Sequence, residues 1–121
     1  MIDIRKIEDA KIKDKLADEF QLKFGPDDCL LGALSSGDVI GFIKYENCGD
    51  TLKIKFISCA SNDFALADGL LKTLLFKCDV STIRVVTLPC EYAQTAKSLG
   101  FSLNDNVFEL KLSEYSNHCQ M

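Results

Sequence analysis

Histidine is nearly absent from this sequence, whose 121 residues contain only His118. No C-x-x-C pair accompanies it, so the ligand spacing of zinc sites is missing and we expect no metal site. No apolar run approaches the roughly 20 residues that a membrane-spanning helix needs. The sequence also lacks internal repeats, low-complexity tracts and linkers. These absences indicate one domain at residues 1–112, followed by a polar tail at residues 113–121.

A surplus of basic side chains is missing as well. Lys and Arg number 14 against 18 Asp and Glu, which gives a net charge of −4. Nucleic acids and anionic membranes attract clustered Lys and Arg, so this composition disfavours both as partners. The first residues, Met1–Lys6, alternate like a strand and lack the apolar stretch of a signal peptide. We therefore expect a cytoplasmic protein.

Cysteine is present in an even number but without a pattern of pairs. The six cysteines are Cys29, Cys48, Cys59, Cys78, Cys90 and Cys119. Several lie within or beside apolar runs, where a thiol behaves as a small hydrophobic group. Because the sequence shows no secretory signal, we expect reduced thiols rather than disulfide bridges.

Apolar periodicity predicts the first elements of the fold. Asp3–Ile7 alternates like a strand, and Asp9–Phe24 has apolar residues at every fourth position, as in an amphipathic helix. Gly25 and Pro26 are expected to end that helix, since proline removes a donor and pushes the preceding residue out of helical geometry. The apolar stripe of the helix consists of Ile12, Leu16, Phe20 and Phe24.

Three strands are predicted next, at Cys29–Leu34, Val39–Tyr45 and Leu52–Cys59. Their connections are short and rich in turn residues, so the strands should form an antiparallel meander. The alternation of the third strand places three apolar side chains on one face, namely Leu52, Ile54 and Phe56.

The period then changes to that of a helix at Phe64–Lys77, which is followed by a strand at Thr82–Leu88. A strand–helix–strand unit requires a right-handed crossover, so Leu52–Cys59 and Thr82–Leu88 should be parallel neighbours in an otherwise antiparallel sheet. The chain continues with a short helix and a hairpin, at Glu91–Leu99, Phe101–Leu103 and Val107–Leu112. The predicted order is therefore β-α-β-β-β-α-β-α-β-β, an α/β domain with a mixed sheet.

Three phrases within this order resemble the GNAT acetyltransferase fold. "VIGFIKYENCGDTLKIKFISCA" is similar to the family's second hairpin, "ALADGLLKTLL" to the opening of its cofactor helix, and "AKSLGF" with "NVFELKL" to its closing helix and last strand. The resemblance covers nearly the whole chain, with one helix where the family usually has two before the meander. It implies one splayed parallel strand pair, helices on both faces of the sheet, and acetyl-CoA as cofactor without a metal.

The resemblance also implies a cofactor site where the parallel strands splay. In the family the pyrophosphate meets amides at the start of the following helix, where the helix dipole favours anions. The family motif Gln/Arg-x-x-Gly-x-Gly/Ala falls on residues 62–67, with alanine at both glycine positions. As an alternative, Asp63 and Asp68 cap an ordinary packed helix. The implied cofactor-binding residues are Ser58, Cys59, Ala60, Asn62, Ala65, Ala67, Asp68 and Gly69.

The family's general acid is a tyrosine, and the matching position here holds Ala96. Tyr92, one turn earlier, is the candidate acid for the thiolate leaving group, and the alternative is an aromatic side chain that packs in the core. Glu46, at a strand end, is the candidate base, and the alternative is a solvated turn residue. Cys59 and Cys90 end the two parallel strands, and we expect inert thiols because the sequence supplies no obvious histidine or cation to activate them.

Three hypotheses about function remain open at this point. The first is an acyl-CoA-dependent N-acetyltransferase that acts on a small amine or a peptide. The second is a binding module that retains the fold and CoA but has lost transfer, which the missing tyrosine and the altered phosphate loop favour. The third is a structural subunit that forms a homodimer through the meander or the terminal strand.

Overall fold

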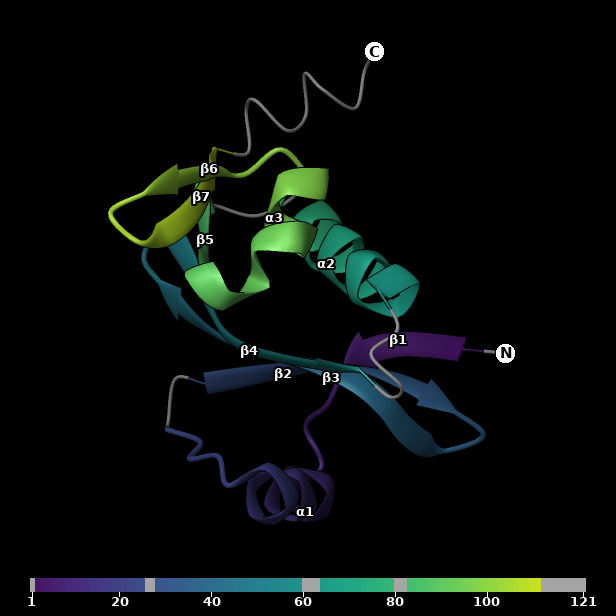
Figure 1. The fold of residues 1–121 in the computed structure, drawn as a ribbon. Coiled ribbons are helices and arrows are strands. Elements are labelled where there is room, and N and C mark those ends of the chain that lie inside the picture. Colours follow the sequence, from purple (N-terminus) through teal and green to yellow (C-terminus); the bar gives the residue numbers. More distant parts are fainter. Residues whose placement is uncertain (1, 26–27, 60–63, 80–82, 112–121) are drawn as a thin grey trace.

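The computed structural model describes residues 2–25, 28–59, 64–79 and 83–111, so the expected polar tail lies outside it. The described chain forms three layers, with one helix below a twisted sheet and two helices above it (Figure 1). Within these ranges no helix is both long and apolar enough to cross a membrane.

The order of elements agrees with the predicted one throughout. Within the described ranges seven strands form one sheet in the order β1-β2-β3-β4-β5-β7-β6, and β4 with β5 is its parallel pair. The remaining neighbours are antiparallel. The elements are β1 (Ile2–Lys6), α1 (Ala10–Phe20), β2 (Asp28–Ser35), β3 (Asp38–Cys48), β4 (Thr51–Cys59), α2 (Phe64–Asp79), β5 (Val85–Pro89), the 3-10 turn η2 (Cys90–Tyr92), α3 (Ala93–Ser98), β6 (Ser102–Asn104) and β7 (Val107–Lys111).

The first helix, α1, is shorter than its apolar spacing predicts. It ends at Phe20 because Gln21 adopts the left-handed conformation, with φ of 55°, and donates its N–H to the carbonyl of Ala17. Such a left-handed cap terminates a helix before Gly25 is reached. Phe24 therefore lies in the following loop, although its side chain still packs against the α1 side of the sheet. The predicted extension of this helix to Phe24 was wrong.

The core is divided by the sheet into two clusters. On one face four leucines of α2 are almost completely buried among strand side chains, and each contributes roughly 1.5–3 kcal/mol through burial. On the other face α1 packs through Leu16 and Phe20 against Phe42 and Leu30. The four leucines are Leu70, Leu71, Leu74 and Leu75. Both faces of the central strands are thus covered, and α2 is firmly held against β4.

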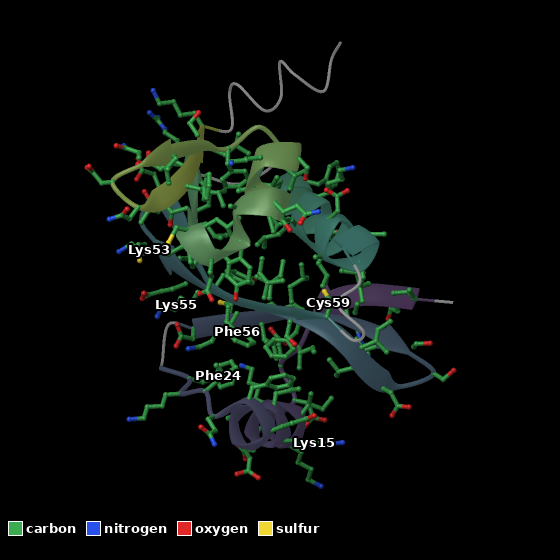
Figure 2. All side chains as sticks on the ribbon, viewed as in Figure 1. Lys15, Phe24, Lys53, Lys55, Phe56 and Cys59 are labelled. Carbon is green, nitrogen blue, oxygen red and sulfur yellow. The ribbon has the colours of Figure 1, made fainter. Side chains whose placement is uncertain are left out.

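A β-bulge in β4 changes which face its side chains occupy. Tyr45 of β3 pairs with Ile54 and Lys44 pairs with Phe56, so Lys55 is an extra residue without an opposite partner. An extra residue resets the alternation of a strand. Ile54 consequently packs on the α2 side, whereas Phe56 lies on the α1 side in the layer seen in Figure 2, with its ring centroid 5.6 Å from that of Phe42. The prediction that Phe56 shares a face with Ile54 was wrong.

Candidate functional site

The parallel pair β4–β5 opens directly after its first three residue pairs. Thr51–Lys53 pairs with Val85–Thr87, and the described residues show no β4–β5 pairing beyond Lys53. The bulge at Lys55 follows two residues later, and bulges increase strand twist. From Ile54 to Cys59, β4 therefore keeps β3 on one side while its other side has separated from β5. The predicted splay of the parallel pair is confirmed.

The side chain of Tyr92 occupies this opening. Its hydroxyl oxygen accepts a hydrogen bond of 2.9 Å from the backbone N–H of Ile57, and it lies 3.4 Å from the Ile57 carbonyl oxygen, to which it donates. Tyr92 ends η2, which follows β5 without a break. The hydroxyl group of Tyr92 thus makes the hydrogen bonds to Ile57 that the backbone of a neighbouring strand would otherwise make.

The environment of Tyr92 keeps its hydroxyl protonated. Partial burial raises the pKa of Tyr92, the hydrogen bond with Ile57 opposes this rise, and the carboxylate of Glu91 adds to it. The net result is a pKa above the ordinary value of 10.0. The ring packs against the α2-side core cluster. Tyr92 is therefore a packed aromatic side chain whose hydroxyl points into the opening, and its catalytic role stays a prediction.

Ala96, where the resemblance places the family's tyrosine, is completely buried in α3. Its carbonyl accepts the N–H of Phe101, 2.9 Å away, where the helix gives way to β6. The methyl group of Ala96 offers no proton. Tyr92, four residues earlier in η2, has a hydroxyl group that reaches the opening.

The start of α2 contains half of the implied cofactor residues. Ala60 and Asn62, like Asp63, fall outside the described residues. Ala67 is buried against the core, whereas Ala65 is exposed. Asp68 lies beyond the first helical turn, where its carboxylate is 2.8 Å from the ammonium of Lys72. Asp68 is therefore ion-paired along the helix with Lys72. The alternative interpretation, in which Asp68 caps the first turn, does not hold for this residue.

Gly69 has no side chain, and no atom lies within 4 Å of the position that a Cβ would take there. Its carbonyl accepts a hydrogen bond of 2.8 Å from the hydroxyl of Thr73. Gly69 thus leaves open space beside α2 without being required for close packing.

A polar groove of about 420 Å³ lies between α2 and α3. Asp68 and Lys72 form one wall, and three neutral polar side chains of α3 form the other. The α3 residues are Gln94, Thr95 and Ser98. Sequence reasoning missed these three residues, because short polar helices of this composition are common on surfaces, and only the fold brings them opposite α2. The groove contains one lysine, Lys72, whose ammonium is paired with the carboxylate of Asp68 on the same wall.

A second cavity, of about 320 Å³, lies on the opposite face of the sheet, between α1 and the strands β3 and β4. Ser58 and Cys59 of the implied cofactor set line this cavity, although the side chain of Cys59 packs against the α2-side core cluster. Figure 2 shows Cys59 at the end of β4. The end of β4 therefore adjoins both the opening beside Tyr92 and the α1-side cavity. Cys90, at the end of β5, is exposed to solvent.

Glu46, the candidate base, belongs to an ionic cluster at the other end of β4. Its carboxylate is 3.5 Å from the ammonium of Lys55, which is also 2.8 Å from the carboxylate of Asp28. Lys44 lies 3.7 Å from the same Asp28, and its ammonium is 5.4 Å from the ring centroid of Phe24. Glu46 pairs across the sheet with Lys53, which is about 13 Å from Ile57 at roughly 3.3 Å per residue. The structure therefore does not bring Glu46 together with Tyr92.

Comparisons with known proteins identify the fold. No protein-family model matches this sequence, and no curated protein does. Among solved structures, the candidate N-acetyl transferase YhhK from E. coli, bound to coenzyme A, matches with a TM-score of 0.74 at 11% identity, over 92% of this chain and 98% of that chain. The ribosomal-protein-S18-alanine N-acetyltransferase from Escherichia coli matches with a TM-score of 0.72 at 14% identity, over 93% and 94%.

A GNAT family acetyltransferase from Elizabethkingia anophelis, with acetyl-CoA bound, matches with a TM-score of 0.69 at 14% identity, over 91% of this chain and 97% of that chain. Identities this low show the fold alone. The chain has the GNAT fold, over nearly its whole length and that of these neighbours.

Proposed function

We propose that this chain is an N-acyltransferase that binds acyl-CoA between β4 and β5 and transfers the acyl group to an amine. The GNAT fold supports this proposal, as does the presence of coenzyme A or acetyl-CoA in two structural neighbours. The observation that carries it is the N–H of Ile57, which faces the opening and is satisfied by a side chain instead of a strand. A side chain can move aside, whereas a paired strand cannot do so without disrupting the sheet.

The described residues fit an acyl-CoA in three places. The N–H of Ile57 is a backbone donor of the kind that binds a thioester carbonyl oxygen. The β4 backbone beyond Lys53, unpaired on its β5 side, offers strand geometry to the amides of a pantetheine arm. Lys72, in the groove between α2 and α3, supplies a cation for the phosphates if they displace the carboxylate of Asp68, its present ion-pair partner.

Acyl transfer to an ammonium group requires a proton acceptor for the amine and a proton donor for the thiolate leaving group. The amine nitrogen forms a bond to the acyl carbon while the carbon–sulfur bond breaks; of the two protons that the ammonium loses, one ends on the sulfur and one in water. The hydroxyl of Tyr92 is a suitable relay to the sulfur because its raised pKa keeps it protonated. Glu46 is ion-paired at the far end of β4, so we assign the first deprotonation of the ammonium to water.

A second candidate function is a CoA-binding module without transfer. Two observations favour it: the hydroxyl of Tyr92 already occupies the Ile57 amide, and Ala96 replaces the family's tyrosine. In a module without transfer, Tyr92 only fills the opening between β4 and β5. A bound CoA would then be held by α2 and the groove between α2 and α3.

Titration with acetyl-CoA, followed by analysis of products, separates these possibilities. We expect saturable heat of binding and a rise in the melting temperature, because a ligand of the folded state stabilises it. Release of free CoA in the presence of an amine panel, measured by mass spectrometry, would establish transfer. Binding without release would favour the module, and no binding at millimolar acetyl-CoA would refute both.

A further inference from the structure

The first strand, β1, lies at one margin of the sheet and pairs on one side only. It pairs with β2 over Ile2–Lys6, and among the described residues no strand pairs with its outer side. The opposite margin is formed by β6, which is only three residues long. An edge strand presents N–H and C=O groups with which another chain can pair. With its five residues, β1 is the longer of the two edges to which a further strand can be added.

One hydrogen bond at the end of β1 determines which of its backbone groups face outward. The N–H of Ile7 donates to the carbonyl of Leu30 over 2.8 Å, and this pair continues the register of β1 with β2. In an antiparallel ladder, alternate residues form the hydrogen-bonded pairs. Arg5 and Asp3 therefore bond to β2 as Ile7 does. The groups that point to the free edge are the N–H and C=O of Ile2, Ile4 and Lys6.

This phase and the charges of β1 together select one way of pairing two copies. In a two-fold antiparallel pair outward groups must meet outward groups, so an axis near the middle of the strand passes through Asp3, Ile4 or Arg5. An axis through Asp3 or through Arg5 places two like charges directly opposite each other, which is destabilising. An axis through Ile4 instead places Asp3 of each copy opposite Arg5 of the other, and it pairs the full length of the strand. Charge complementarity thus favours the register centred on Ile4.

The side chains of β1 suit this register on both of its faces. Asp3 and Arg5 share one face, where their charged atoms lie 3.6 Å apart within one copy and their side chains are mostly exposed. An exposed pair of this kind contributes little by itself, and the other copy gives each charge a second partner. On the other face Ile4 meets its own counterpart. Ile2, which is 51% exposed, meets Lys6, whose aliphatic stem can cover it.

We propose that β1 is a homodimerisation edge, at which two copies pair antiparallel about a two-fold axis through Ile4 and form one continuous sheet. The edge is short, and small interfaces are typical of weak or transient association. We expect a dissociation constant on the order of 10–100 μM. The strands β2 and β3 lie between β1 and β4, so the pairing does not use the opening beside Tyr92. The proposal is therefore independent of acyl transfer.

Charge reversal tests the register, with sedimentation of the full chain from about 10 μM to about 1 mM. Asp3→Arg and Arg5→Asp each place like charges opposite each other, so each should raise the dissociation constant by about ten-fold or more. An equimolar mixture of the two variants should form a heterodimer, because every facing pair is then opposite in charge. The double variant Asp3→Arg/Arg5→Asp should recover the homodimer within about three-fold. As a control, Lys15→Asp reverses an exposed charge on α1 and should change the dissociation constant by less than about two-fold.

Hydrogen exchange of the wild type locates the interface without any substitution. The amide of Ile4 faces the free edge, so its exchange should slow as the protein concentration rises. The amide of Arg5 is bonded to β2 and should exchange slowly at every concentration. This contrast between neighbouring residues is expected only where a second strand pairs with the outer side of β1.

Several outcomes would overturn the proposal. Sedimentation could show a monomer at every concentration, homodimers that persist in both single variants, or a mixture of the variants that stays monomeric. Protection of Ile4 at all concentrations would mean that another segment of the same chain covers the edge. Concentration-dependent protection of Leu103 in β6, without protection of Ile4, would place the interface at the other margin of the sheet.

Discussion

The two halves of β4 differ in what lies beside them. Thr51–Lys53 is held between two strands, with β3 on one side and β5 on the other. Ile57, only four residues beyond Lys53, has β3 on one side and the hydroxyl of Tyr92 on the other. Both halves contain apolar and polar residues, although the alternation ends where Phe56 adjoins Ile57, so composition alone does not explain the difference. What separates them is one extra residue, Lys55, which bends the strand away from its parallel neighbour.

The open half of β4 can form a binding site without destabilising the sheet. The paired half contributes backbone hydrogen bonds and core burial through Leu52. The open half keeps its N–H satisfied by a side chain, so the fold carries no unpaired buried donor at Ile57. That bond can be exchanged for a ligand at small net cost, whereas breaking the β4–β5 ladder would unfold part of the sheet.

Tyr92→Phe should have the largest effect on function. If the hydroxyl relays the proton, turnover should fall by about 100-fold, since general acid catalysis contributes roughly that much or more. Acetyl-CoA affinity should rise by several-fold at the same time, because the Ile57 amide loses its competing partner. Steady-state kinetics and calorimetry measure the two quantities separately.

Cys90→Ser, at an exposed position of the same 3-10 turn, is the matched control and should leave both quantities unchanged. Unchanged turnover in Tyr92→Phe would remove the hydroxyl from the mechanism. A fall in acetyl-CoA affinity would contradict the idea that Tyr92 and the ligand compete for Ile57.

Asp28→Asn should have the largest effect on stability. The side chain of Asp28 is only 5% exposed, and its carboxylate accepts hydrogen bonds from Lys55 and from the backbone N–H of Gly25. It thereby holds the bulge residue on the α1 side and anchors the loop after α1. Removing its charge should lower the free energy of unfolding by about 2 kcal/mol, because Lys44 and Lys55 lose their shared partner. Urea denaturation measures the loss, and Asp14→Asn at an exposed position of α1 should cost far less.

The pH dependence of the free energy of unfolding should reflect the titration of the Asp28 carboxyl group. Burial alone would raise the pKa of Asp28, but the hydrogen bonds from Lys55 and Gly25 and the charge of Lys44 together lower it below its ordinary value of 3.8. A lowered pKa in the folded state means that the carboxylate stabilises the fold above the unfolded pKa and that this contribution is lost as the pH falls through the folded pKa. The wild type should therefore lose stability more steeply than Asp28→Asn below about pH 4. Parallel curves from pH 6 to pH 2 would show that Asp28 titrates normally.

The order of the elements could be predicted from the sequence because it depends on local periodicity. Leu70, Leu71, Leu74 and Leu75 specify the buried face of α2 by their spacing alone, and the crossover rule then makes β4 and β5 parallel. The bulge could not be predicted, since adjacent apolar residues such as Phe56 and Ile57 also occur in strands that are buried on both faces, and only the register with β3 exposes Lys55 as an extra residue. The end of α1 was missed because the apolar spacing continues to Phe24, whereas the helix ends where Gln21 adopts the left-handed conformation.

The candidate site was only partly foreseen from the sequence. The resemblance implied Ser58 and Cys59 as cofactor residues, which stays a prediction, and both line the α1-side cavity. Gln94, Thr95 and Ser98 were not foreseen, because nothing in a single polar helix indicates which surface it will face. Lys72 was overlooked as well, since its i,i+4 spacing from Asp68 is that of an ordinary helix ion pair.

Lys72→Ala offers the smallest and most specific test of how the open half of β4 would be used. Lys72 lines the groove between α2 and α3. Lys53 is an exposed lysine on the paired half of β4 (Figure 2). Removing Lys72 should weaken acetyl-CoA binding by about five-fold, because a partly exposed ion pair contributes on the order of 1 kcal/mol. Lys53→Ala makes the same change of charge away from the groove and should leave the affinity within about two-fold. Added salt should weaken binding more in the wild type than in Lys72→Ala, since screening acts on the pair that the variant lacks. Equal losses in the two variants would mean that the phosphates respond to overall charge, and the groove between α2 and α3 would then not be the path of the ligand.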